Sequence, residues 1–406
     1  MSGPITMTRE LRERFEIDDG VDGVVRFKLM KLAADASELE IYMPQVFPVA
    51  GYIQPPELAD ELYREVGPFL QNPGRTEFER GWIPDETFME LIEYQNAWLG
   101  RATQWLCTHH PWDLCFVQTH TPDYLSHYYL TDLDPVSKRP RERRENAERQ
   151  VTRALKSVDQ FVGDAMAVAD EDTLIVLVSD HGGTASPIAR HSVNRVLAEA
   201  GLLAYRHDPA TGLEVIDWSR TKAVKQRSIH VYVNLKGRDP AGIVPPEEYD
   251  EVRQQVIDAM MVYRDPETQR RVYAMAIRRE EALSLGQGSS GSGDVIFAVN
   301  SEFDENHGGQ LPGRRYGKYS LRAVLIMAGP GIKRGHHLNR VAFTTDIVPT
   351  VVQLMRLPVP RGCEGAVLHE ALEDPDAVIK ELARAREESE RWRKAYDAYR
   401  KLTHLE

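Results

Sequence analysis

The chain has 406 residues, of which 42% are hydrophobic, enough to bury the core of two or three domains or of one large α/β domain. Its 62 acidic and 50 basic residues give a net charge of −12, which argues against a nucleic-acid binder that works through a general basic face. Three cysteines (Cys107, Cys115 and Cys363) match no zinc-motif spacing and make no disulfide framework, so a reducing compartment is favoured.

The beginning of the sequence carries no targeting signal. Residues 1–20 (MSGPITMTRELRERFEIDDG) are charged and lack the apolar segment of a signal peptide. No apolar run approaches the ~18 residues that a membrane-spanning helix needs. We therefore expect a soluble, cytoplasmic protein that has no contact with a membrane.

The first hundred residues predict a hairpin and two helices. Residues 24–31 and 39–46 alternate as strands do. Helical spacing follows in residues 55–69 and 84–106, and the second of these begins with a proline and two acidic residues, which suit a first turn.

Two later segments have the composition of buried strands. They are residues 112–119 (WDLCFVQT) and 172–179 (DTLIVLVS), the second being the most apolar in the chain. Between them the sequence predicts a polar, arginine-rich loop at 132–146 and a helix over about 147–168. Residues 187–201 predict a helix that ends at its final glycine.

The remaining sequence predicts a small α+β subdomain over 203–290 and then a return to buried strands. We interpret the glycine- and serine-rich residues 286–293 as a linker, because no helix start follows them. Strands rich in Val, Ile and Leu that alternate with amphipathic helices predict a mostly parallel sheet covered on both faces. The last predicted elements are strands at 294–300 and 321–332, a helix at 344–357 and a charged helix at 374–402.

Acidic and histidine side chains follow three of the predicted buried strands. Asp123 and His127 come four residues apart after the first, Asp180 and His181 directly after the second, and His307, beside two glycines, after the third. In a helix, Asp123 and His127 share a face. Since ligands of such sheets bind at the carboxyl ends of the strands, the joint placement favours one shared site.

Each of these features alone also has an ordinary structural explanation. His307 can be a plain loop histidine, and Asp123 with His127 can be a surface pair. Together, carboxylate and imidazole ligands suit Zn²⁺ or Mn²⁺ better than Ca²⁺ or Mg²⁺, and two such ions can clamp the oxygens of a phosphoryl transfer. Four other histidines lie in polar turns, and we interpret them as surface residues: His109, His110, His336 and His337.

Several spaced motifs resemble the alkaline phosphatase superfamily, specifically its type I phosphodiesterase/nucleotide pyrophosphatase branch. The matching segments include TPDYLSHYY, SDHGG, IHVYVNLKGRDPAGIV, NHGG and TTDIVPTVVQLMRLPVPRGCEG, in the family's order from about residue 112 to 366. Upstream, the sequence is similar to an insert of bacterial members. The resemblance implies an alkaline-phosphatase-like α/β/α sandwich around a mostly parallel sheet, here without its first strand or strands and with a small α+β insert.

The resemblance also implies a two-metal site. Asp123, His127 and His307 would bind one divalent ion and Asp180 and His181 a second, with zinc expected and manganese as the alternative. In the family, an Asp and a Thr or Ser nucleophile complete the second site. No convincing counterpart is found here, so the catalytic nucleophile is unidentified.

The chain is therefore interpreted as the C-terminal portion of the family, in three regions. These are the insert (1–75), the metal-binding domain (76–370) with its 203–290 subdomain, and the charged helix (371–406). We expect a hydrolase of phosphorylated small molecules that is truncated, or split with an N-terminal half encoded separately. A non-catalytic metal-binding or partner-binding remnant and a metal-dependent phosphomutase remain the alternatives.

Overall fold

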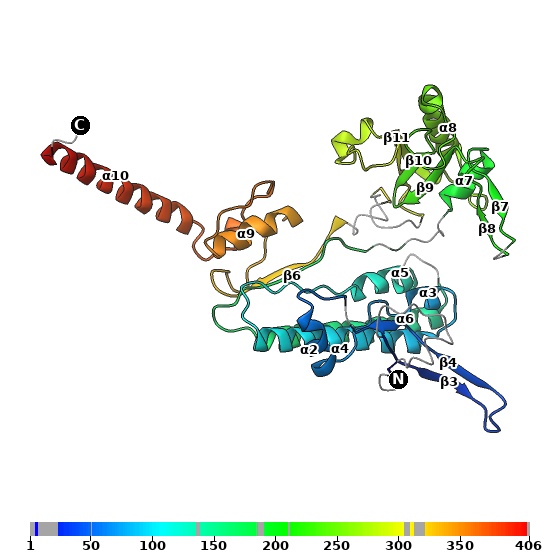
Figure 1. Ribbon diagram of the computed structural model, residues 1–406, viewed down its shortest axis with the longest axis horizontal. Coiled ribbons are helices and arrows are strands. Elements are labelled where there is room, and N and C mark those ends of the chain that lie inside the picture. The colour runs from blue at the N-terminus through cyan, green and yellow to red at the C-terminus, as the bar shows by residue number, and fades with distance from the viewer. Residues whose placement is uncertain are drawn as a thin grey trace. The chain divides into compact units, whose positions relative to one another are not determined.

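The computed structural model divides the chain into two compact units, and each is described by itself (Figure 1). The first comprises Met1–Asp164 and His181–Ala323, and the second Ala165–Asp180 and Val324–Glu406. The structure describes residues 5–6, 23–49, 51–134, 139–183, 185, 191–209, 212–303, 309–311 and 321–403.

Helices dominate the part of the first unit before residue 165. The 25-residue helix α4 (Asp85–His109) begins after Pro84 with two acidic residues in its first turn, as expected. Its apolar stripe packs into a core with α5 and α6, which includes Phe88, Ile92 and Leu125. The other elements of this part are β1 (Ile5–Thr6), β2 (Gly23–Val25), β3 (Lys28–Leu32), β4 (Leu39–Tyr42), β5 (Val46–Pro48), α2 (Glu57–Glu65), α3 (Arg75–Glu79), α5 (Thr121–Leu133) and α6 (Arg141–Met166).

The small strands of this part pair antiparallel. β2 lies between β1 and β5, while β3 and β4 form the predicted hairpin. Strands are confirmed in both predicted segments, but each segment is divided between two sheets, 24–31 into β2 and β3 and 39–46 into β4 and β5. Helices are found in both expected N-terminal segments, and α6 begins six residues before its predicted start.

The rest of the first unit holds a four-stranded antiparallel sheet in the order β11-β12-β10-β9. All five residues of the central strand β12 are buried. α7 and α8 pack against the sheet, and Gly201, at a φ of 72°, lies just after α7, where an αL conformation favours glycine. The elements are α7 (Val193–Glu199), β7 (Tyr205–His207), β8 (Glu214–Ile216), β9 (Ala223–Arg227), β10 (His230–Val233), η1 (Pro246–Glu248), α8 (Tyr249–Val262), β11 (Tyr273–Arg278), η2 (Glu281–Leu285) and β12 (Val295–Val299).

The second unit contains one strand pair and the C-terminal helices. β6 (Ile175–Val178) pairs with β13 (Leu325–Ala328) in antiparallel register. After them come η4 (Thr344–Asp346), α9 (Ile347–Leu354), η5 (His369–Ala371) and the long helix α10 (Ala377–Thr403). No helix within the described ranges is long and apolar enough to cross a membrane.

Every ladder between the described strands is antiparallel, so parallel pairs of the expected sheet are not among them. One expected strand is wrong. Residues 112–119 form no strand, and Leu114 and Phe116 in this segment are 73% and 82% exposed. Composition alone predicted a buried strand there, but a strand also needs a neighbour to bond its backbone, and no described strand pairs with this segment.

Candidate functional site

Two of the five predicted ligands lie on one face of α5. Asp123, in its first turn, places Oδ1 3.4 Å from Nε2 of His127, and 19% of each side chain is exposed. The spacing prediction is confirmed, since residues i and i+4 of a helix are neighbours. A carboxylate and an imidazole held this close are a pair of side chains that a divalent metal can use together.

The start of α5 is fixed by a buried asparagine of α4. Asn96 is fully buried, and its Oδ1 accepts a hydrogen bond from the Thr119 hydroxyl at 2.7 Å. Its Nδ2 donates to Thr121 Oγ1 at 3.0 Å and to Ser157 Oγ at 2.8 Å, which joins α4, α5 and α6. Sequence reasoning missed this residue. The available signal was its position four residues after Ile92, on the apolar stripe of α4, where an amide needs partners.

A second face of α5 is held by tyrosines. Tyr129 donates to Asp85 at 2.6 Å and Tyr128 to Glu79 at 2.7 Å, while the Tyr128 ring packs edge-on against Phe88. Burial raises the pKa of both phenols, and the neighbouring carboxylates raise it further, so both stay neutral donors. These contacts fix the rotation of α5 and therefore the direction in which Asp123 and His127 point.

The segment after His181 passes close to α5. A Cβ built on Gly183 would lie 2.5 Å from Ser126 Oγ, one residue before His127, so only glycine fits this approach without a shift. His181 Nδ1 lies 2.8 Å from the Gly182 carbonyl oxygen. Because a carbonyl only accepts, this contact requires the proton on Nδ1. This is the tautomer that a backbone carbonyl commonly fixes in metal-binding histidines.

Three of the five predicted ligands, Asp123, His127 and His181, lie among the described residues of the first unit. Asp180 is exposed and follows β6 in the second unit, and His307 lies outside the described residues. In the described ranges, no three His, Cys, Asp or Glu side chains form a group that could hold a metal ion. The two-metal constellation therefore stays a prediction, of which the Asp123–His127 pair is the part with observed geometry.

Two threonines in the N-terminal part, Thr76 and Thr87, carry a hydroxyl group of the kind that serves as the nucleophile in the family. Thr87 is 1% exposed, and its hydroxyl accepts a hydrogen bond from Lys28 Nζ at 3.0 Å, so it is closed to a substrate. Thr76 is exposed on the five-residue helix α3.

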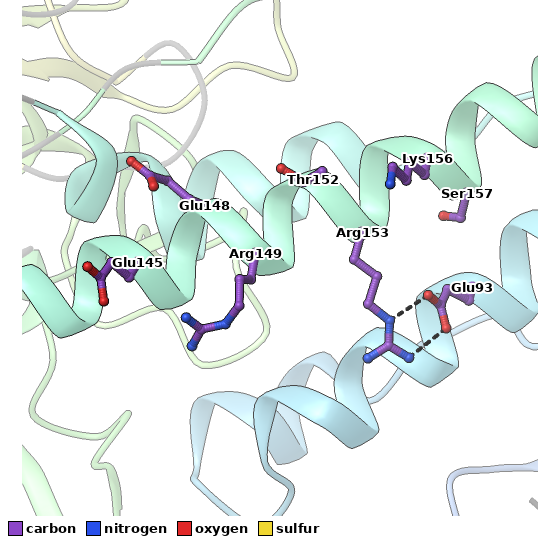
Figure 2. A pocket seen from close by; sticks show the side chains of 8 residues that line it. All are labelled: Glu93, Glu145, Glu148, Arg149, Thr152, Arg153, Lys156 and Ser157. Carbon is purple, nitrogen blue, oxygen red and sulfur yellow. Dashed lines mark hydrogen bonds and ion pairs between the residues drawn. The ribbon is translucent and has the colours of Figure 1, made fainter.

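An open groove of about 780 Å³ lies between α4 and α6 and contains none of the predicted ligands (Figure 2). Arg153 crosses the groove and forms a bidentate ion pair with Glu93, with Nε 2.5 Å from Oε1 and Nη2 2.7 Å from Oε2. Most of the lining side chains are charged, and Glu145 and Glu148 form ion pairs with Arg141 and Arg144 one turn earlier on α6, which is typical of a solvated helix face. The lining residues are Glu93, Glu145, Glu148, Arg149, Thr152, Arg153, Lys156 and Ser157.

Comparison with known proteins assigns the family. Residues 29–308 match the type I phosphodiesterase/nucleotide pyrophosphatase family, a range that includes all five predicted ligands. The chain belongs to this family, and its alkaline-phosphatase-like α/β fold is thereby confirmed. No curated protein matches the sequence.

Among solved structures, the crystal structure of wild type alkaline phosphatase PafA is similar, at 17% sequence identity and a TM-score of 0.39. The similarity covers 56% of this chain and 43% of that chain. The present chain thus spans less than half of the length of the phosphatase it matches.

Proposed function

We propose that this chain is the metal-binding part of a metal-dependent phosphoric ester hydrolase of the phosphodiesterase/nucleotide pyrophosphatase type. The observation that carries the proposal is the Asp123–His127 pair, 3.4 Å apart on a helix whose start and rotation are fixed by buried contacts. Both residues lie in the segment that matches the family. The three free cysteines fit a reducing cytoplasm.

The donor set suits the expected ions. Asp123, His127 and His307 would hold one divalent ion, and Asp180 and His181 a second, with zinc favoured and manganese as the alternative. When bound, such ions supply Lewis-acid stabilisation of charge on a phosphoryl oxygen. The chain's own contribution is orientation: Asn96 and Tyr129 hold α5, and the Gly182 carbonyl fixes the His181 tautomer.

We further propose that the nucleophile comes from an N-terminal half, joined to this chain or encoded separately. Support comes from residues 112–118, whose sequence is that of a buried strand although Leu114 and Phe116 are largely exposed. A strand contributed by that half would bond their backbone and cover their side chains. Phosphorylated small molecules are the expected substrates.

Hydrolysis of bis-p-nitrophenyl phosphate tests this function. The chelator-treated chain should be inactive, and zinc or manganese should restore at most a trace of turnover when the chain is alone. Addition of the segment encoded immediately upstream, in cis or in trans, should raise the rate by orders of magnitude, because covalent catalysis divides one difficult displacement into two easier ones.

Two substitutions of Asp by Asn separate a metal site from general electrostatics. Asp123→Asn should abolish the restored turnover, since a neutral amide is a poor ligand, whereas Asp258→Asn, at an exposed position of α8, should leave it unchanged. Equal loss in both variants, or full metal-independent turnover, would contradict the proposal. Metal binding that persists without any turnover in the assembled protein would favour the non-catalytic alternative.

A further inference from the structure

The β3–β4 hairpin turns an apolar face to solvent. Leu29 and Leu32 of β3 are 55% and 57% exposed, and Leu39 and Ile41 of β4 are 62% and 52% exposed. Leu29 pairs with Ile41 and Leu32 with Leu39 across the two strands, so all four lie on the same side, which we call the hairpin face. Figure 1 shows the hairpin as the dark blue strand pair that extends from the helices of this part.

The opposite side of the hairpin carries the polar residues and packs on the protein. Lys28 donates to Thr87 Oγ1 at 3.0 Å and forms a 2.7 Å ion pair with Glu90 of α4. The Tyr42 hydroxyl packs closely on Gly74, since a Cβ built on this glycine would lie only 2.7 Å from it. The Tyr42 ring also packs against the apolar core of this part, so one side of the hairpin is held by specific contacts and the hairpin face stays open.

A β-bulge aligns the hairpin face. The register shifts between Leu29 and Lys31, so Met30 has no partner of its own on β4. Since side chains alternate along a strand, Leu29 and Leu32, three residues apart, would otherwise point to opposite sides. The bulge interrupts the regular backbone hydrogen bonds between the two strands. In return, both leucines point toward solvent, as an interaction surface requires.

We propose that the hairpin face is a self-association surface that packs against the same face of a second copy of this chain. The face itself carries no charge, and the ion pair between Lys31 and Glu38 neutralises its edge, so two copies of a chain of net charge −12 can meet there without concentrated repulsion. The acidic residues near the tip, Asp35, Glu38 and Glu40, disfavour an anionic lipid surface or a nucleic acid as the occupant.

A two-fold axis suits this surface and limits its strength. Two flat apolar faces can stack about 10 Å apart, each residue meeting its symmetry counterpart or a neighbour of similar size. The four side chains, with Met43 47% exposed just after β4, form a small patch; even the largest apolar patch of a typical monomer covers only about 300–600 Å². A stable interface buries about 800 Å² per partner, so we expect a weak dimer with a dissociation constant of roughly 1–100 μM.

Sedimentation velocity of the full chain between about 1 and 100 μM tests the proposal. The wild-type chain should shift from monomer to dimer over this range. Ile41→Lys should raise the dissociation constant at least about tenfold, because symmetry would bury two ammonium groups in each dimer. Leu39→Lys should act in the same way, and each variant should keep the wild-type thermal unfolding temperature because both positions are exposed.

The control is Leu213→Lys, which places the same charge at a leucine that is 64% exposed in another part of the unit. It should leave the dimer intact. A wild-type chain that stays monomeric at 100 μM would overturn the proposal, as would a dimer that survives both hairpin substitutions or is weakened equally by Leu213→Lys. Binding of a monomeric wild-type chain to neutral phosphatidylcholine vesicles would assign the face to lipid instead.

Discussion

Among single residues, the amide of Asn96 has more influence on the candidate site than its lack of charge suggests. It is the buried point at which the segment before α5, α5 itself and α6 meet, through Thr119, Thr121 and Ser157. If a smaller side chain replaced Asn96, each of these three hydroxyls would lose a hydrogen-bond partner. A buried polar group left without a partner costs about 1–3 kcal/mol.

Asn96→Ala should therefore lower the free energy of unfolding by about 2–3 kcal/mol and also weaken metal binding, because the first turn of α5 carries Asp123. Urea unfolding and zinc titration measure the two effects. The matched control is Asn146→Ala, whose amide only accepts 3.3 Å contacts from Arg149 and Gln150 on the same helix and should change stability by less than about 0.5 kcal/mol. A stable Asn96→Ala variant with unchanged zinc affinity would show that the network does not position α5.

The histidines provide the second residue-scale prediction. His127→Ala and His307→Ala should each weaken zinc binding at least about a hundredfold, since even the loss of an outer-shell partner lowers metal affinity roughly 10–100-fold. His337→Ala, at an exposed position outside the constellation, should have no effect. Zinc competition against a chromogenic chelator measures all three. If the three variants bind zinc equally, the ligand assignment is wrong.

At the scale of elements, the buried strand β12 depends on a carboxylate just before it. Asp294 is fully buried and accepts 2.8 Å bonds from both terminal nitrogens of Arg238, a 2.6 Å bond from Tyr249 and a 2.7 Å bond from the Val233 amide. Burial acts to raise its pKa, but the bonds from Arg238, Tyr249 and Val233 outweigh burial and hold the pKa below its usual value.

The sign of the resulting pH dependence follows from linkage. A carboxyl whose pKa is lower in the folded state stabilises the fold fully above its unfolded pKa of about 3.9, and this contribution is lost as the pH falls through the folded pKa. Asp294→Asn should reduce the free energy of unfolding by about 2–3 kcal/mol at pH 7, and the difference from wild type should shrink as the pH falls below about 4. Urea unfolding at pH 7, 5 and 3 measures this. The exposed Asp258→Asn is the control, and a pH-independent difference would refute the linkage.

Sequence predicted elements well wherever a local pattern determines them. The alternation of the β3–β4 hairpin, the acidic first turn of α4 after Pro84 and the four-residue spacing on α5 depend on neighbours in the chain, and all three were found. Strand pairing depends on distant partners, which is why residues 112–119 were wrongly predicted to form a strand. The Asn96 network likewise joins residues up to 61 positions apart. The positions of Asp180 and His307 relative to α5 stay predictions.

At the scale of the whole molecule, the two units share one feature. Each contains a segment with the apolar sequence of a buried strand whose side chains are exposed. In the first, Leu114 and Phe116 are exposed, and in the second, Val178 of β6 and Ile326 of β13 are 43% and 58% exposed. β6 and β13 form a two-stranded sheet, which is marginal in isolation. Exposed apolar strands with unpaired edges are typical of surfaces that pair with further strands. The proposed N-terminal half would supply those strands.

The last prediction follows from that proposal. Phe116→Asp should change the unfolding free energy of the chain alone by less than about 0.5 kcal/mol, because the ring is 82% exposed. It should nevertheless remove most of the hydrolysis gained when the upstream segment is supplied, because assembly would then bury an unpaired carboxylate. Leu283→Asp, at a leucine 66% exposed elsewhere in the unit, should change neither quantity. Urea unfolding and bis-p-nitrophenyl phosphate hydrolysis separate the two effects. A gain in rate that survives Phe116→Asp would place the assembly surface elsewhere, whereas a large loss of stability in the chain alone would show that the segment is already packed.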